Sequence, residues 1–225
     1  TVKNSFAEYL RCLPIKSPNA LVKYYDGSYK NNYDIYSAVV DLDIGNKDLH
    51  QCADAIIRLR AEYLWHQQNY QAIQFNLTNG MPVPYEKWMN GYRVKVNGNK
   101  TTWVKLHSFA NSYEDFWEYL EFIFMYAGTY SLSKELKPKS LQEIQIGNVF
   151  IQGGFPGHAI IVIDKVVHKT TGNTMIMLAQ SYMPAQEIQI LKNSDELGSW
   201  FLIEDNMKVL YTPEWTFYPK DLKAF

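Results

Sequence analysis

The run GNVFIQGGFPGHAIIVID, residues 147–164, decides how the chain is expected to fold. Residues 149–151 form a short apolar run and residues 159–163 form a second, β-branched one, and both lengths are typical of buried strands. The glycines of the connection 152–157 allow a tight turn and are expected to leave His158 uncrowded. His158 stands where this loop becomes the second strand, so its imidazole is either a structural group or a general base.

Length and composition limit the possible functions. The 225 residues suffice for one large domain or two small ones, and the hydrophobic content of 47% is ordinary for a globular protein. The 22 basic and 23 acidic residues are interspersed and give a net charge of −1, which argues against nucleic-acid binding because that requires a basic face. Aromatic residues make up 15% of the chain. Most must be core, and any surplus would line a groove.

The sequence predicts no membrane span, no metal site and no cofactor. No apolar run approaches the ~20 residues of a transmembrane helix. Cys12 and Cys52 are too few for a structural zinc site and fit either one disulfide or two free thiols. We predict free thiols, because Cys12 follows a short peripheral helix whereas Cys52 belongs to a core helix. The chain begins without Met, as expected of a trimmed or mature fragment.

The clearest helix signal covers residues 48–66. Apolar side chains recur there at helical spacing, Asp48 is the expected N-cap, and Gln51 completes a capping-box pattern. Cys52 then lies in the first turn, where the helix dipole and free amides favour a thiolate. Such a thiol would be alkylated selectively near neutral pH. The alternative is that Cys52 is a small apolar core residue, which free cysteines commonly are.

The other elements have shorter signals. They are a helix over 4–12, strands over 21–25 and 35–40, a strand from 71 that runs into an aromatic loop, a hairpin around 97–99, a helix over 113–126 capped by residues 112–115, a helical turn over 132–136, and strands within 174–180, 187–191, 200–203 and 208–211. Because helices come first and strands later, the sequence predicts a single α+β domain over residues 1–225.

Two further polar groups are site candidates beside Cys52 and His158. If the strand over 174–180 pairs with the His158 strand, Gln180 ends beside the imidazole and could fix its tautomer. The alternative is an ordinary polar residue at a strand end. Asp164 is a second candidate for this role, although it lies far along the same strand.

An aromatic loop, residues 82–92, is a candidate substrate-binding segment. Tyr85, Trp88 and Tyr92 stand there among turn-forming residues, and loops on a rigid scaffold commonly bind ligands. The alternative is that the loop folds down as part of the core.

Long motifs identify a family resemblance. The segments QCADAIIRLRAEYLW (51–65), GNVFIQGGFPGHAIIVID (147–164), LAQSYMPAQ (178–186) and NGMPVPYEKWMNGYR (79–93) closely resemble the bacterial domain of unknown function 4846 family. The resemblance covers nearly the whole chain. It implies a protein exported to the periplasm or held at the cell envelope as a lipoprotein, and it brings no established activity.

A more distant resemblance is to papain-like hydrolases of the NlpC and CHAP types. Their pattern is a Cys that opens a helix, a Gly-Asp pair before a strand, a His that starts the next strand, and a third polar residue. Cys52, His158 and Gln180 fall in this order, whereas Asn148 stands where Asp is usual and QCAD replaces a DCSG-like motif. The resemblance implies a papain-like α+β fold with a Cys-bearing helix on an antiparallel sheet and an insertion over residues 70–140.

The sequence therefore supports two functions of different classes. The first is a cysteine amidase or peptidase acting on cell-wall peptide or a related amide, with Cys52 as nucleophile, His158 as base and Gln180 orienting the base. The second is a non-catalytic surface protein that keeps the fold and binds a glycan or peptide in an aromatic groove. The substrate and the oligomeric state are not predicted.

Overall fold

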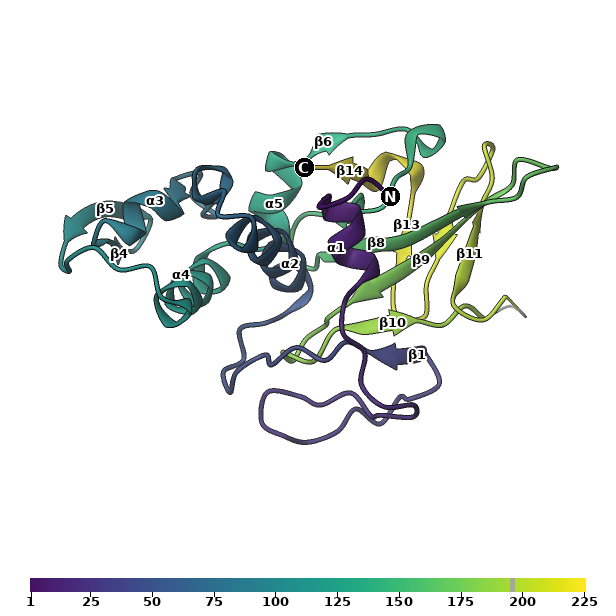
Figure 1. The fold of residues 1–225 in the computed structure, drawn as a ribbon, viewed down its shortest axis with the longest axis horizontal. Coiled ribbons are helices and arrows are strands. Elements are labelled where there is room, and N and C mark those ends of the chain that lie inside the picture. The colour runs from purple at the N-terminus through teal and green to yellow at the C-terminus, as the bar shows by residue number, and fades with distance from the viewer. Residues whose placement is uncertain (195–196) are drawn as a thin grey trace.

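The computed structural model describes residues 1–194 and 197–225, and within them eight strands form one antiparallel sheet (Figure 1). The strands lie in the order β1 (Tyr36–Val39), β10 (Gln189–Leu191), β9 (Thr174–Gln180), β8 (His158–Val167), β7 (Val149–Gln152), β14 (Leu222–Ala224) and β6 (Lys137–Pro138), and β11 (Trp200–Ile203) also pairs with β9. The predicted antiparallel pairing of β8 with β9 is confirmed.

Strand β8 is buried on both faces. Ala159, Ile161 and Ile163 belong to one core cluster, whereas Ile160 and Val162 belong to another on the opposite face. This double burial explains why the segment is a continuous apolar run and does not alternate with polar residues. The first five residues of β8 after His158 are thus fixed by packing, and the strand start is held in place.

Two helices pack on β8 from one side. Helices α1 (Phe6–Arg11) and α2 (Cys52–His66) both contact β8 and lie across the same face of the sheet (Figure 1). The N-cap of α2 is Gln51 and not Asp48, because the capping box joins Gln51 with Asp54. Asp48 instead accepts hydrogen bonds from the Gln51 side chain and from the Ala185 amide. Cys52 is therefore the first residue of the helix.

A group of helices and hairpins, here called the aromatic lobe (residues 70–126), extends from one end of the sheet (Figure 1). It consists of η1 (Tyr70–Ala72), β2 (Gln74–Asn76), β3 (Pro82–Pro84), α3 (Tyr85–Met89), β4 (Tyr92–Asn97), β5 (Lys100–Lys105) and α4 (Tyr113–Tyr126). The predicted hairpin is confirmed as β4 and β5, and the helix over 113–126 with its Ser112–Asp115 capping box is confirmed as α4. The predicted aromatic loop contains α3 instead.

The remaining elements connect these parts. They are α5 (Thr129–Glu135), η2 (Leu141–Glu143), β12 (Leu210–Tyr211), β13 (Thr216–Phe217) and η3 (Pro219–Asp221). The strand predicted over residues 21–25 is wrong, because that segment makes only isolated bridges to Tyr29 and Gln186. The fold class is α+β, as predicted. Among the described helices, none is long and apolar enough to cross a membrane.

Candidate active site

The start of α2 opens into a cleft of ≈ 490 Å³, here called the thiol cleft. Its walls come from parts of the segments 48–54, 124–129 and 154–157, together with Met183. The loop between β7 and β8 approaches α5 closely, since a side chain at Gly157 would collide with the hydroxyl of Thr129. Phe155 on that loop is 98% exposed at the cleft. The cleft thus joins the two sequence motifs that contain Cys52 and His158.

Cys52 lies in the wall of this cleft with only 8% of its surface exposed. Burial, and secondarily the neighbouring Asp54, raises the pKa of its thiol to about 11, although backbone amides that include those of Ala53 and Ala159 favour the thiolate. The expectation of a thiolate at neutral pH is therefore wrong for this state, because desolvation outweighs the helix start. Both cysteines are free, as predicted; Cys12 is exposed.

His158 is enclosed by aromatic rings. Its ring centroid lies 4.7 Å from that of Tyr182, 5.4 Å from that of Trp215 and 6.0 Å from that of Phe217. The expectation that the glycine loop leaves the imidazole uncrowded is wrong, because only 1% of His158 is exposed. Burial lowers the pKa of His158 to about 4, with a smaller lowering by Lys30 and a partial offset by the bond to Gln180. The imidazole is neutral at pH 7.

Gln180 makes the hydrogen bond to His158 that the strand pairing predicts. The Gln180 Oε1 lies 2.9 Å from the His158 Nε2, and the Gln180 Nε2 donates to Glu214 at 2.6 Å. Because a carboxylate only accepts, Glu214 turns the amide so that its oxygen faces the imidazole. The His158 Nε2 must then carry the proton, which leaves the lone pair on Nδ1.

Lys30 completes this row of polar groups. Its Nζ pairs with Glu214 at 2.8 Å and donates to the Gln186 side chain at 3.0 Å. No sequence pattern points to Lys30 and Glu214, because both come from irregular segments far from the motifs in sequence. A run from Lys30 through Glu214 to Gln180 therefore fixes the tautomer of the buried imidazole.

Cys52 and His158 are neighbours without a direct bond. The amide of Ala159, the residue after His158, is one of the groups that stabilise the Cys52 thiolate. Tyr182 gives a second link. Its ring contacts the imidazole, and the pKa of its hydroxyl is raised by burial first, then by Glu214 and by Cys52. In the part of the chain that the structure describes, no hydrogen bond joins the Cys52 sulfur to the imidazole. Catalytic hydrogen bonds are often long in ligand-free structures.

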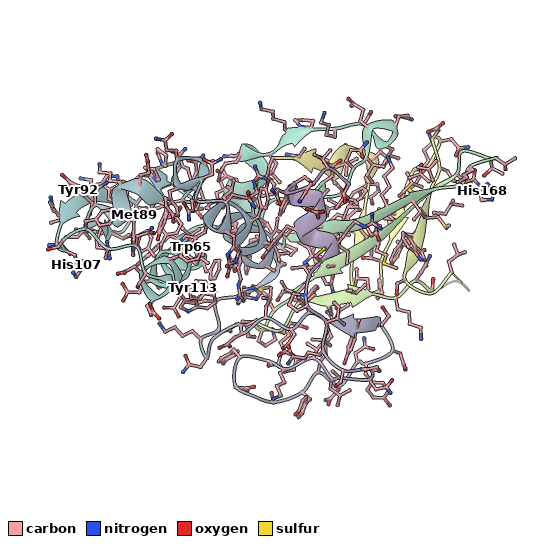
Figure 2. All side chains as sticks on the ribbon, viewed as in Figure 1. Trp65, Met89, Tyr92, His107, Tyr113 and His168 are labelled. Atoms are coloured by element: carbon pink, nitrogen blue, oxygen red, sulfur yellow. The ribbon has the colours of Figure 1, made fainter. Side chains whose placement is uncertain are left out.

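The remaining polar candidates lie elsewhere. Asp164 pairs with Arg11 at 3.2 Å near the opposite end of β8, so it does not orient His158. Figure 2 shows His107 and His168 at opposite ends of the molecule. Within residues 1–194 and 197–225, no group of three or more His, Cys, Asp or Glu residues could hold a metal ion.

Two of the three aromatic residues predicted to bind substrate, Tyr85 and Trp88, belong to the core. Tyr85 is fully buried and Trp88 is 5% exposed, and both pack against Tyr119 of α4. Tyr92 is half-buried at the far end of the aromatic lobe (Figure 2). None of the three lines the thiol cleft. The apolar faces of α3 and α4 cover each other, as the core alternative for this segment predicts.

Asp54 lines the thiol cleft and was not among the residues predicted from the sequence. Its Oδ2 accepts the Gln51 amide at 3.0 Å, whereas its Oδ1 is buried with no hydrogen-bond partner among the described residues. The pattern of an acid three residues after the N-cap could have identified it, had the cap been assigned to Gln51.

Comparison with known proteins gives a family but no activity. Residues 1–224 match the family described as a domain of unknown function (4846), and the chain belongs to this family. No curated protein matches the chain, and no solved structure does either.

Proposed function

We propose that this member of the domain of unknown function 4846 family is a cysteine hydrolase of papain-like NlpC type that cleaves an amide in cell-wall peptide or a related molecule. The observation that carries the proposal is the 2.9 Å bond between the His158 Nε2 and Gln180, which leaves the lone pair on Nδ1. The amide of Ala159, the next residue, favours the Cys52 thiolate, so the start of β8 lies near the start of α2. An imidazole oriented by a polar side chain is the arrangement of Cys-His hydrolases. Export to the cell envelope, implied by the family resemblance, is part of the proposal.

The reaction uses these groups in two halves. The thiol of Cys52 gives its proton to the Nδ1 of His158 and attacks the amide carbonyl, and His158 then passes the proton to the leaving amine. Water, deprotonated by His158, attacks the thioester, releases the acid and restores the thiol. Backbone amides, those of Cys52 and Ala159 among them, favour the thiolate. The Cys52 amide is the proposed donor to the oxyanion that develops on the carbonyl oxygen.

The raised pKa of Cys52 and the lowered pKa of His158 make the resting pair neutral. Substrate in the thiol cleft must therefore bring sulfur and imidazole into contact before the proton moves. This requirement favours general-base activation during the attack over a preformed ion pair.

The test is cleavage of soluble cell-wall peptides, followed by mass spectrometry of the products. Wild type is expected to release a new amine and a new carboxylate, and Cys52→Ala and His158→Ala are expected to abolish cleavage. Cys12→Ala is the matched control, because Cys12 is exposed and outside the thiol cleft, and should retain full activity. No cleavage by folded wild type, or cleavage unaffected by Cys52→Ala, would defeat the proposal.

A second function, glycan or peptide binding without catalysis, is favoured by a different cleft. This cleft of ≈ 370 Å³ is lined by Trp117, Tyr113 and Arg58 among others and contains neither Cys52 nor His158. The Arg58 guanidinium stands 4.7 Å from the Trp117 ring centroid. Aromatic rings commonly stack on sugars. Loss of glycan binding in Trp117→Ala, together with inactive wild type, would favour this function.

A further inference from the structure

Asp54 has an unmet need for a hydrogen-bond donor. The side chain is 5% exposed, one oxygen accepts the Gln51 amide, and the other oxygen has no partner among the described residues. Burial raises the pKa of this carboxyl well above its usual range, while the Gln51 amide lowers it and no basic side chain contributes. The capping role uses only the Oδ2 that accepts the Gln51 amide, so it does not explain why the Oδ1 is buried without a donor.

The place of Asp54 in the fold points to a ligand. Asp54 and Cys52 both line the thiol cleft, and they stand two residues apart in the first turn of α2. The free oxygen itself is buried, so a group that satisfied it from the cleft would have to enter between Asp54 and the cleft space and would therefore lie close to the sulfur. The cleft volume of ≈ 490 Å³ is within the range of small-molecule and peptide sites.

We propose that Asp54 binds a free amino group of the substrate, so that the hydrolase acts on a peptide whose amino terminus lies beside the scissile amide. A primary ammonium supplies three hydrogen-bond donors and a positive charge. Both suit the free oxygen of Asp54, which has neither a donor nor a basic side chain beside it among the described residues. The ammonium also offsets the negative charge of Asp54, which otherwise raises the pKa of the Cys52 thiol. The inference rests on the proposed function, because it names the substrate class of Cys52.

The experiment compares binding of alanyl-alaninamide and its N-acetylated form by NMR titration of isotope-labelled protein. The free-amine peptide is expected to shift the amide signals of the cleft in a saturable way, and acetylation should weaken binding roughly tenfold or more, since it removes a charge-assisted hydrogen bond. Equal binding of the two peptides, or binding of neither at tens of millimolar, overturns the inference.

Variants locate the effect. Asp54→Asn keeps an oxygen for the Gln51 amide but loses the charge, so it should lose the preference for the free amine. Asp115→Asn is the matched control, because Asp115 is the capping acid of α4 and lies outside the thiol cleft; it should keep the preference. A preference that survives in Asp54→Asn also overturns the inference. If that variant does not fold, the acetylation comparison in wild type decides.

The outcome separates this inference from the proposed function. Cys52→Ala should keep the preference for the free-amine peptide over its acetylated form, because the amine is held by Asp54 and not by sulfur. Amine-dependent binding by a wild type that hydrolyses no peptide would defeat the hydrolase and leave the amine site. Hydrolysis with no preference for a free amine would defeat the amine site and leave the hydrolase.

Discussion

The thiol cleft and the aromatic lobe each contain a helix that begins with a capping box, but the two capping acids differ in how their oxygens are paired. In the lobe, Asp115 caps α4 and accepts from both the amide and the hydroxyl of Ser112. At the cleft, Asp54 completes the capping box of α2 in the same way, but one of its buried oxygens has no partner among the described residues. The lobe contains more aromatic residues than the walls of the thiol cleft, yet its rings pack on one another. Both regions contain a buried polar atom without a partner among the described residues, the Trp88 indole nitrogen in the lobe and the Asp54 Oδ1 at the cleft. Only the second belongs to an ionisable group that lines a cleft, and this distinguishes the region suited to function.

The largest expected effect is on the stability of the lobe. Trp88→Ala removes a ring that contacts Tyr119, Phe122 and the Arg93 guanidinium, so unfolding should become easier by about 3–5 kcal/mol. Cys52→Ala removes one small group at a cleft wall and should cost about 1 kcal/mol. Denaturant unfolding of both variants measures the difference.

This pair of variants can break the comparison between the two regions. Tyr92→Ala, at the half-buried end of the lobe, is the control and should lie well below Trp88→Ala. If Cys52→Ala cost as much as Trp88→Ala, Cys52 would be a core residue in the same sense as Trp88. The cleft would then have no functional distinction from the lobe.

The second effect is the acid sensitivity of the imidazole beside the cleft. The pKa of His158 falls from its ordinary value of 6.5 to about 4 on folding, so between these pH values the unfolded chain binds the extra proton. Stability is therefore lost as pH falls through this window, by about 3 kcal/mol in total, and is unaffected by this group above pH 6.5.

Urea unfolding at several pH values measures this loss. His158→Gln removes the titrating group and should flatten the slope between pH 6.5 and 4. His50, whose pKa burial lowers to about 3, remains in the variant and leaves a residual slope. An equal slope in wild type and His158→Gln would show that the imidazole is hydrated, contrary to its aromatic enclosure.

Local patterns predicted most elements of the fold. The hairpin β4–β5, the cap of α4 and the strands β7, β8 and β9 follow from turn residues, capping residues and apolar runs that act over a few positions. The pairing of β8 with β9 also placed Gln180 beside His158. These features need no long-range information, because each depends on adjacent segments.

The failures concern burial and distant contacts. Periodicity does not say that Trp215 and Phe217 return to cover His158, nor that Lys30 pairs with Glu214 beneath Gln180. For the segment 82–92, turn and aromatic residues leave a ligand-binding loop and a core segment equally open, and only the packing of α3 against α4 decides between them. The fold class was therefore readable from sequence, whereas the protonation of the site was not.

The third effect compares the two thiols. A pKa of about 11 leaves Cys52 almost entirely protonated at pH 8, so iodoacetamide should alkylate it roughly 100-fold more slowly than the exposed Cys12. Intact-mass spectra followed by peptide mapping give the two rates. Cys12→Ser isolates the slower reaction. Faster alkylation of Cys52 than of Cys12 would show that the site holds a thiolate after all.

The smallest expected effect isolates the two capping acids. Asp115→Ala removes the acceptor for the Ser112 amide and should destabilise the protein by about 1 kcal/mol, as lost caps do.

Asp54→Asn keeps an acceptor for the Gln51 amide and removes a carboxyl whose pKa is raised by burial, so it should destabilise the protein less than Asp115→Ala does, or should stabilise it. The sign follows because a folded-state pKa above the unfolded value makes stability fall as pH rises past the unfolded value near 4. Thermal unfolding at pH 5 and pH 8 tests this: the advantage of Asp54→Asn over wild type should grow at the higher pH. If Asp54→Asn instead lost as much stability as Asp115→Ala at both pH values, the Asp54 carboxylate would be fully satisfied in the folded chain, and the two helix starts would be equivalent.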